Sequence, residues 1–188
     1  IAAAAIILAC NGYGANPALI AEHIPEMNDA LYFGHPGNQG EAILWGKALG
    51  AELLHLSGYQ GHGSVAHPHG ILVTWALMME GGIQVNAKGE RFSNEHNGYS
   101  EQAVSVLGQE EKIAFNIFDE RLAVLGRGFD DFNKAEESGA LIKANSIEEL
   151  ASKISVEPAT FCKTLAKCEQ YAGGDQVDPF GRNFEPRK

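Results

Sequence analysis

The chain opens with a continuous run of apolar residues. Residues 1–10 carry no charged side chain and show no polar face, which is typical of a strand covered on both sides by other elements. A turn at 11–14 follows. Asn16 before Pro17 then predicts a short helix, because asparagine caps helices and proline suits the first helical position. This order predicts the remnant of a parallel sheet whose neighbouring strands belong to sequence outside the given chain.

A second helix is predicted after a second glycine-rich loop. Residues 35–40 form that loop, and the apolar residues of 41–49 recur at helical spacing. Gly50 predicts the end of the helix, since glycine readily adopts the left-handed conformation found there. The pattern then predicts a short strand at 51–56 and an irregular Gly- and His-rich loop at 57–70.

The C-terminal half predicts a small α+β unit. A hairpin over 83–93 turns at Gly89, and a capping box beginning at Ser146 starts a helix. The other predicted elements are helices at 100–107, 130–138 and 158–171 and strands at 113–118 and 141–143. The chain is thus expected to divide into parts over 1–56 and 57–172, followed by a polar tail over 173–188.

Composition excludes several classes of protein. The 188 residues hold 14 Lys and Arg against 24 Asp and Glu, a formal charge of −10, and no basic cluster is present to neutralise a nucleic-acid backbone. The longest apolar run is far shorter than the roughly 20 residues of a membrane span, and it lacks the charged start of a signal peptide. Three cysteines without metal-ligand spacing favour a reducing, cytoplasmic setting.

Three segments could carry chemistry. Glycines at 12, 14, 37 and 40 stand at two turns before helices, where free backbone N–H groups suit a pyrophosphate, although glycine also serves such turns for steric reasons alone. Four histidines lie close together in sequence, at His55, His62, His67 and His69. Because no Glu or Cys completes a metal pattern, they favour a polar substrate or backbone hydrogen bonds over a metal.

Tyr99 stands just before a predicted helix. The positive end of the helix dipole would favour its phenolate, while simple aromatic packing is the alternative.

Together and in this order, these segments resemble the FAD-dependent fumarate reductase, succinate dehydrogenase and 3-ketosteroid dehydrogenase superfamily. The matching motifs occupy 8–17 (LACNGYGANP), 36–43 (PGNQGEAI), 80–95 (EGGIQVNAKGERFSNE) and 178–182 (DPFGR). The resemblance implies an α+β capping domain of a flavoprotein dehydrogenase over 57–172, with a remnant of the α/β FAD-binding domain over 1–56. Residues 173–188 would be a polar tail or a linker back to a further FAD-domain segment.

The resemblance also implies roles for individual residues. His62 and Thr74 match positions that hold a substrate carboxylate, and Tyr99 matches the tyrosine that exchanges a proton with substrate carbon in the ketosteroid branch. The residues implied to contact FAD are Ala9, Cys10, Asn11, Gly12, Asn38, Gln39, Gly40 and Glu41.

Departures from the fumarate reductase pattern bear on the substrate. Trp75 and Met78 stand where those enzymes carry the Glu and Arg of a proton-delivery route, and Tyr99 stands in place of their proton-donating Arg. An always-charged guanidinium and a phenol with a pKa near 10 are not interchangeable. These changes argue against fumarate and favour a more apolar substrate.

The function expected from the sequence is therefore part of an FAD-dependent oxidoreductase. It would dehydrogenate or reduce a C–C bond next to a carbonyl or carboxylate of a small molecule, with no metal. The alternatives are a carboxylic-acid dehydrogenase of the tricarballylate type, and a non-catalytic cap or binding module. By itself the chain is expected to bind little FAD and to be inactive. Other FAD-domain segments of its own chain, or a second copy in a homo-oligomer, would cover its first strand.

Overall fold

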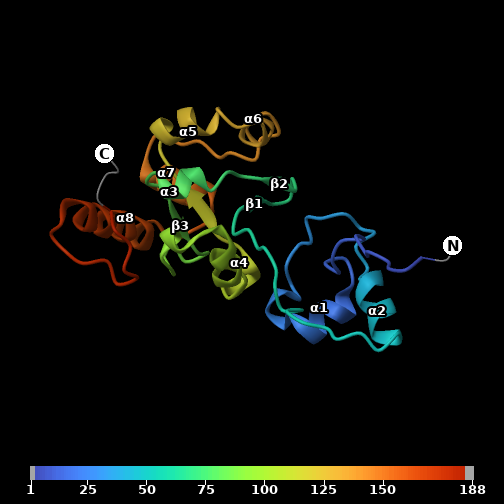
Figure 1. Cartoon of the computed structure of the whole chain (residues 1–188). Helices are drawn as coiled ribbons and strands as arrows, with labels where there is room; N and C mark the ends of the chain where they lie inside the picture. Colours follow the sequence, from blue (N-terminus) through green and yellow to red (C-terminus); the bar gives the residue numbers. More distant parts are fainter. Residues whose placement is uncertain (1–2, 185–188) are drawn as a thin grey trace. The chain divides into compact units, whose positions relative to one another are not determined.

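The computed structural model describes residues 3–184, and the chain divides into two compact units. Unit 1 spans Ile1–Gln60 and unit 2 spans Gly61–Lys188. Unit 1 holds the helices α1 and α2, and unit 2 holds a mixture of helices and short strands (Figure 1).

Unit 1 is built on two helices and a small core. Helix α1 (Pro17–His23) begins as predicted, because the Asn16 side chain accepts hydrogen bonds from the N–H groups of Ala18 and Leu19. A short 3-10 turn, η1 (Pro25–Met27), follows, and α2 (Glu41–Ala48) confirms the second predicted helix. The buried core of the unit comprises Tyr13, Leu19 and Ile24.

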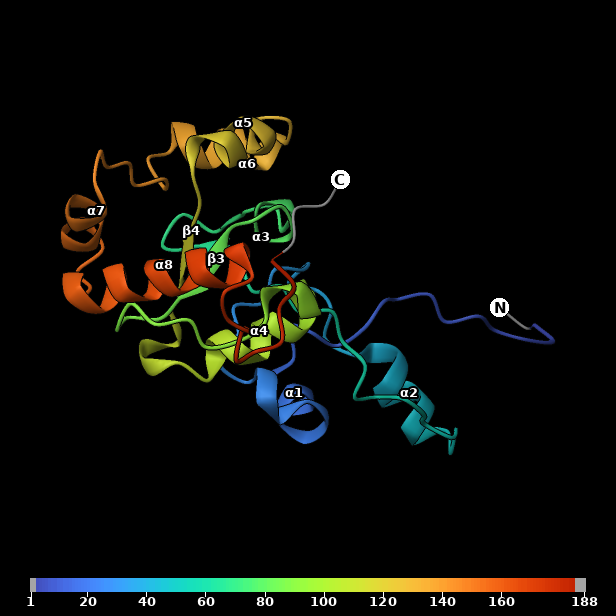
Figure 2. The same ribbon diagram turned by 90° about the vertical axis from the view of Figure 1, so that its left-hand side faces the viewer.

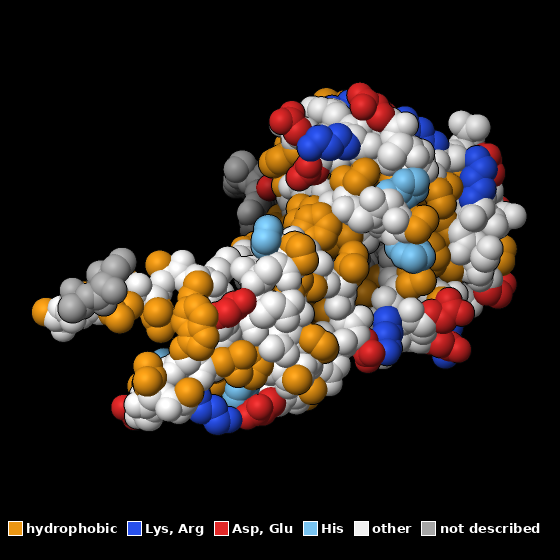
Figure 3. Space-filling model, turned by 90° about the vertical axis from the view of Figure 1, so that its right-hand side faces the viewer, with side chains coloured by type: hydrophobic (Ala, Val, Ile, Leu, Met, Phe, Trp, Pro, Cys, Tyr) orange, Lys and Arg blue, Asp and Glu red, His pale blue; other side chains and the backbone are white. Residues whose placement is uncertain are grey.

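The two strands predicted in this part are wrong. Within residues 3–60 the structure contains no strand, and Ile6 and Ile7 are 80% and 91% exposed. A doubly covered strand needs neighbours that supply hydrogen bonds and apolar cover, and the described part of unit 1 supplies neither. Residues 1 and 2 of the predicted strand lie outside the described residues. Large hydrophobic side chains are consequently exposed on unit 1 (Figure 3).

Unit 2 contains two short antiparallel pairs of strands. Strand β1 (Val65–Ala66) pairs with β2 (Ile71–Leu72), so the segment predicted as an irregular loop holds part of a hairpin. Strand β3 (Ile83–Val85) pairs with β4 (Phe115–Ile117) in a register that aligns Ile83 with Ile117.

The predicted hairpin over 83–93 forms only its first strand and its turn. Gly89 has a φ of 77°, and the Asn86 N–H donates to the Glu90 carbonyl at 2.9 Å. Residues 91–93 do not pair with β3, because the Arg91 side chain enters a buried cluster of charges, described below. The more distant β4 takes the place beside β3.

The helices of unit 2 follow the predicted pattern, with two further α-helices and two 3-10 turns. The predicted helices are confirmed as α4 (Tyr99–Leu107), α6 (Asp130–Glu137), α7 (Ile147–Lys153) and α8 (Pro158–Gly173). The added elements are α3 (Ala76–Met79), α5 (Glu120–Gly126) and the 3-10 turns η2 (Glu95–Asn97) and η3 (Glu110–Lys112). No strand forms at 141–143.

Two apolar clusters hold unit 2 together. One joins α3, α5 and α6 through Leu77, Leu122 and Phe132. The other joins β3 to α7 and α8 through Val85 and Phe161, with α8 beside the β3–β4 pair (Figure 2). Burial of these side chains removes apolar surface from water, at about 25 cal/mol per Å².

Candidate functional site

The β1–β2 hairpin brings the segments of His62 and Thr74 together. The Val73 N–H donates to the Ser64 carbonyl at 3.0 Å, which extends the pairing beyond the two strands. Continuing the same register places residues 62 and 63 beside 75 and 74. In agreement, the His62 ring meets the Trp75 ring edge-on with centroids 6.1 Å apart.

The start of α4 brings Tyr99 to the same place. The Gly63 N–H donates to the Tyr99 carbonyl at 2.9 Å, and the Gly61 N–H donates to the Ser100 hydroxyl at 2.8 Å. As a result the His62 and Tyr99 rings stack, with centroids 5.1 Å apart and planes inclined by 22°. Thr74 lies across the hairpin and is half-buried, and its hydroxyl accepts from the Ala76 N–H.

The surroundings of His62 determine its protonation. Burial lowers the pKa of the imidazole. The backbone N–H of Ser64 donates to Nδ1 at 3.2 Å, so in the neutral ring the proton sits on Nε2. Tyr99 beside it is 39% exposed. The pair thus offers a neutral N–H donor and a phenol that a ligand can reach.

A network of buried and half-buried polar side chains adjoins His62 and was missed at the sequence level. It consists of Ser64, Gln84, Ser93, Gln102 and Asn116, which are hydrogen-bonded to one another in sequence-distant pairs. The available signal was Gln84, a lone polar residue within the apolar strand Ile83–Val85.

A second feature missed at the sequence level is a buried cluster of four charges. Arg91 pairs with Glu95 at 2.7 Å and with Asp178 at 2.6 Å, and Arg182 pairs with Glu95 at 3.0 Å. None of the four side chains is more than 4% exposed. Burial alone would raise the pKa of Glu95, but the hydrogen bonds and charge of Arg91, together with the charge of Arg182, outweigh it and lower that pKa.

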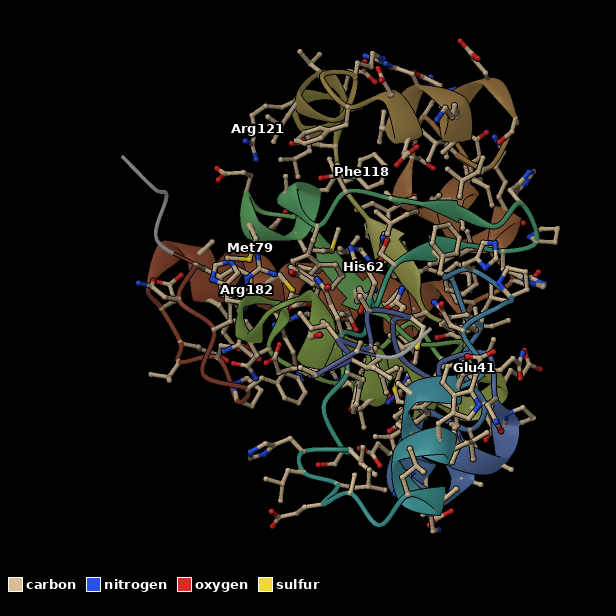
Figure 4. The ribbon with its side chains drawn as sticks, turned by 45° about the vertical axis from the view of Figure 1, so that its right-hand side comes forward. Glu41, His62, Met79, Phe118, Arg121 and Arg182 are labelled. Atoms are coloured by element: carbon tan, nitrogen blue, oxygen red, sulfur yellow. The ribbon has the colours of Figure 1, made fainter. Side chains whose placement is uncertain are left out.

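The cluster includes two residues of the segment 173–188, which the sequence predicted as a polar tail or a linker. Asp178 and Arg182 are each 5% exposed when their backbone atoms are included. The guanidinium of Arg182, which is labelled in Figure 4, donates to the carbonyls of Gly82 and Met78 at 2.7 and 3.0 Å. The described part of this segment is therefore built into unit 2, because its charges find their partners there. Residues 185–188 lie outside the described residues.

In unit 1 the two glycine-rich segments lie side by side. The Ala15 N–H donates to the Asn38 carbonyl at 3.0 Å, and the Asn16 side chain donates to the Gln39 carbonyl at 2.9 Å. The Gln39 amide in turn donates to the Ala15 carbonyl at 3.1 Å. The structure thus joins two of the sequence segments that were implied to contact FAD.

The start of α2 has the features of a cofactor cradle. Gly40 is its N-cap, with a φ of 85° and no side chain to accept from the first-turn N–H groups. Those donors, with the Glu41 carboxylate beside them, suit phosphate or hydroxyl oxygens. In the adjoining turn, Asn11 has a φ of 63° and accepts from the Gly12 N–H. Gly12 is exposed, as is Ala9, whereas Cys10 is half-buried. These residues fit an FAD site.

One expectation from the sequence changes. Trp75 and Met78 do not form an apolar substrate surface, since they are 6% and 0% exposed and belong to a packed core. His55 in unit 1 is exposed, and so are His67 and His69 in unit 2. Within residues 3–184, no group of three or more His, Cys, Asp or Glu side chains is arranged to hold a metal ion.

Comparison with known proteins identifies the class. The family described as "FAD binding domain" matches residues 1–186, so the chain belongs to that family, whose cofactor is FAD. Its similarity to FAD-dependent fumarate reductases is confirmed by a relative and a solved structure, and 3-ketosteroid dehydrogenases share its fold.

The particular relatives are fumarate reductases and a steroid dehydrogenase. A probable fumarate reductase, Ifc3, of Shewanella frigidimarina (strain NCIMB 400) is 29% identical over 99% of this chain and 31% of its own length. The open conformation of a flavocytochrome c3 fumarate reductase matches with a TM-score of 0.75 and 26% identity, over 98% of this chain and 32% of that one. A 3-ketosteroid delta1-dehydrogenase from Sterolibacterium denitrificans shares the fold, with a TM-score of 0.66 and 23% identity over 90% and 33% of the two chains.

The chain spans about a third of the length of these relatives. Among the described residues, no helix combines the length and the apolar character that a bilayer crossing requires.

Proposed function

We propose that the chain is part of an FAD-dependent oxidoreductase that adds or removes hydrogen across a carbon–carbon bond next to a carbonyl or carboxylate. The observation that carries this proposal is the stacked pair of His62 and Tyr99, a neutral hydrogen-bond donor beside a half-exposed phenol. Bound FAD supplies the hydride acceptor or donor for such a reaction.

His62 and Thr74 bind the activating oxygen of the substrate. The His62 Nε2–H is a donor because Nδ1 accepts from Ser64. The Thr74 hydroxyl accepts from the Ala76 N–H, which leaves its own proton available to donate. Two fixed donors on one oxygen stabilise the negative charge that develops there as a neighbouring C–H bond breaks or forms.

Tyr99 moves the proton at the neighbouring carbon. Its hydroxyl is the acid or base of the pair, and stacking on His62 fixes the plane in which it lies. A positioned general acid or base typically contributes about 10²–10⁴-fold to the rate.

Unit 1 provides cofactor contacts in this proposal. The contacting residues are Ala9, Cys10, Asn11, Gly12, Asn38, Gln39, Gly40 and Glu41. Residues 1–56 then form part of an FAD-binding domain, 57–172 form a capping domain, and 173–188 lead back toward a further FAD-domain segment. Such segments would also cover the exposed hydrophobic side chains of unit 1, among them Ile7 and Leu49 at 91% and 87% exposure. By itself the 188-residue chain should bind little FAD.

The test is Tyr99→Phe in the complete protein that contains this chain. Loss of the hydroxyl should lower kcat by about 10²–10⁴-fold and leave the flavin absorbance unchanged. Tyr171→Phe, the same substitution on α8 where the ring contacts Phe184, is the matched control and should turn over at the wild-type rate. A wild-type rate for Tyr99→Phe would show that this tyrosine only packs.

The reaction class is tested by anaerobic mixing of the flavin-loaded protein with saturated and α,β-unsaturated ketones and carboxylates. Bleaching or reoxidation of the flavin spectrum by a member of either series supports the proposal. Failure of both series to react would overturn it.

A further inference from the structure

A continuous chain of hydrogen bonds crosses the interior of unit 2. Gln102 on α4 donates to the Gln84 side-chain oxygen on β3 at 2.7 Å, and the Gln84 amide donates to Asn116 Oδ1 on β4 at 2.7 Å. Gln84 and Gln102 are only 2% and 1% exposed. A buried amide that is left unpaired is destabilising, so a network of this kind is stable only where every hydrogen bond is made.

This chain of hydrogen bonds ends at Gly63 and Ser64, the two residues that follow His62. The Gln84 amide donates its second proton to the Gly63 carbonyl at 2.8 Å, and the Asn116 amide donates to the Ser64 hydroxyl at 2.5 Å. Ser64 is also the residue whose backbone N–H donates to His62 Nδ1. The interior amides therefore hold the short segment that sets the orientation of the imidazole.

The Gly63 carbonyl determines which atom donates and which accepts in every one of these hydrogen bonds. The Gly63 carbonyl can only accept, so the Gln84 atom that faces it must be the NH₂ group. The Gln84 oxygen then faces Gln102, and the NH₂ group meets the Asn116 oxygen, which turns the Asn116 NH₂ group toward Ser64. The arrangement has no alternative in which an amide is flipped and all partners remain satisfied.

We propose that Gln84 and Asn116 are positioning residues: they fix residues 63 and 64 so that His62 stays in the Nε2–H tautomer, with that N–H held toward the substrate oxygen. The catalytic consequence rests on the proposed function, whereas the tautomer itself does not. An oxygen-binding donor must keep its proton on the same nitrogen through each turnover, and the Ser64 N–H enforces this only while its backbone is held.

The test compares Gln84→Met with Gln102→Met in the complete protein. Both changes remove a buried amide, but only the Gln84 amide hydrogen-bonds to residue 63. The Gln102 amide bonds to Gln84 and Ser93, and the Gln102 Cβ and Cγ atoms that approach Gly63 are kept in methionine. Gln84→Met should lower kcat/KM by about 10–100-fold, and Gln102→Met should lower it much less. The two variants should also differ in the ¹⁵N NMR spectrum of protein labelled at histidine, in which the His62 signals are assigned by their loss in His62→Gln. The protonated-Nε2 signature should persist in Gln102→Met and give way to a tautomer mixture in Gln84→Met.

Ser64→Ala is a less disruptive variant that tests the same proposal if Gln84→Met does not fold. Ser64→Ala deletes the hydroxyl that accepts from Asn116 and keeps the backbone N–H, so it should shift the tautomer ratio in the same direction by a smaller amount. An unchanged His62 spectrum in Gln84→Met, or in Ser64→Ala where that variant alone folds, would overturn the proposal. So would equal effects of Gln84→Met and Gln102→Met.

The outcome separates this proposal from the proposed function. If no substrate reacts but the His62 tautomer responds to Gln84→Met alone, the positioning role stands and the proposed reaction fails. If Tyr99→Phe abolishes turnover while Gln84→Met leaves rate and spectrum intact, the reaction stands and the positioning role fails.

Discussion

Replacement of Glu95 by glutamine should strongly destabilise unit 2. The Glu95 carboxylate accepts from Arg91 Nε and Nη2 at 2.9 and 2.7 Å and from the Gln84 N–H at 3.0 Å. It also lies 3.0 Å from Arg182 Nη1. Glutamine keeps the shape of the side chain, but it removes the negative charge and turns an NH₂ group toward a cationic donor.

The magnitude follows from the charges left behind. In the wild type two guanidinium groups face two carboxylates, all at most 4% exposed. After Glu95→Gln the same space holds two cations and one anion. Removal of one partner from a buried ion pair typically costs about 3–5 kcal/mol, a large part of the roughly 5–15 kcal/mol that stabilises a domain. With a urea m value of about 2 kcal/mol per M, the midpoint should fall by about 1.5–2.5 M.

Urea unfolding followed by the fluorescence of Trp75 measures this change. Trp75 is buried and its indole donates to the Glu95 carbonyl, whereas Trp45 is 54% exposed and is replaced by phenylalanine in the background. Glu110→Gln is the matched control, because the Glu110–Lys88 pair is exposed and such pairs contribute little. Equal midpoints for Glu95→Gln and Glu110→Gln would refute the reasoning.

Two further predictions concern unit 1 and His62. Gly40→Ala should destabilise unit 1 by more than Gly50→Ala: both have positive φ, but a Cβ at 40 would lie 2.5 Å from Leu19 Cδ1 while one at 50 meets nothing within 4 Å. Equal unfolding midpoints would contradict this. His62 should titrate below the ordinary value of 6.5 in a proton NMR titration, because burial lowers its pKa. Its contribution to stability is then full above about pH 6.5 and is lost as the pH falls through the lower, folded value. A midpoint at or above 6.5 would exclude that environment.

Helices were predictable here because their signals are local. Asn16 and Pro17 mark the start of α1 within two adjacent positions, and the Ser146 hydroxyl accepts from the Glu149 N–H three residues later. The capping box differs only in that Glu149 bonds back to the N–H of Asn145 rather than of Ser146. Such contacts are complete within one turn of chain, so no knowledge of tertiary structure is required.

Strands and buried charges were not predictable in the same way. The apolar run at 1–10 has the composition of a buried strand, but a strand exists only where a neighbour pairs with it. β3 likewise pairs with a segment about 30 residues away rather than with the chain that follows its turn. Arg91 and Asp178 are polar residues by composition, and only the fold makes them partners.

The candidate site shows the same division between residues and their arrangement. The resemblance supplied His62 and Tyr99 individually, but their stacking depends on hydrogen bonds between Gly63 and Tyr99 across the hairpin and α4. A tyrosine at the start of a helix does not by itself indicate proton transfer. The proposed role of Tyr99 rests on its stacking against His62.

Gln84 connects the two polar features in the interior of unit 2. Its backbone N–H donates to Glu95 in the charge cluster, and its side chain donates to the Gly63 carbonyl beside His62. Through Glu95, the same cluster is tied to Arg182 near the C-terminal end of the chain. The position of β3 at Gln84 is therefore fixed by the charge cluster, whose members come from the segments at 91–95 and 178–182. Gln84 in turn fixes the segment beside His62.

A buried glutamine in an otherwise apolar strand would be destabilising if its polar groups had no partners. Gln84 avoids that cost because its polar groups are hydrogen-bonded, and these bonds join the charge cluster to the segment beside His62.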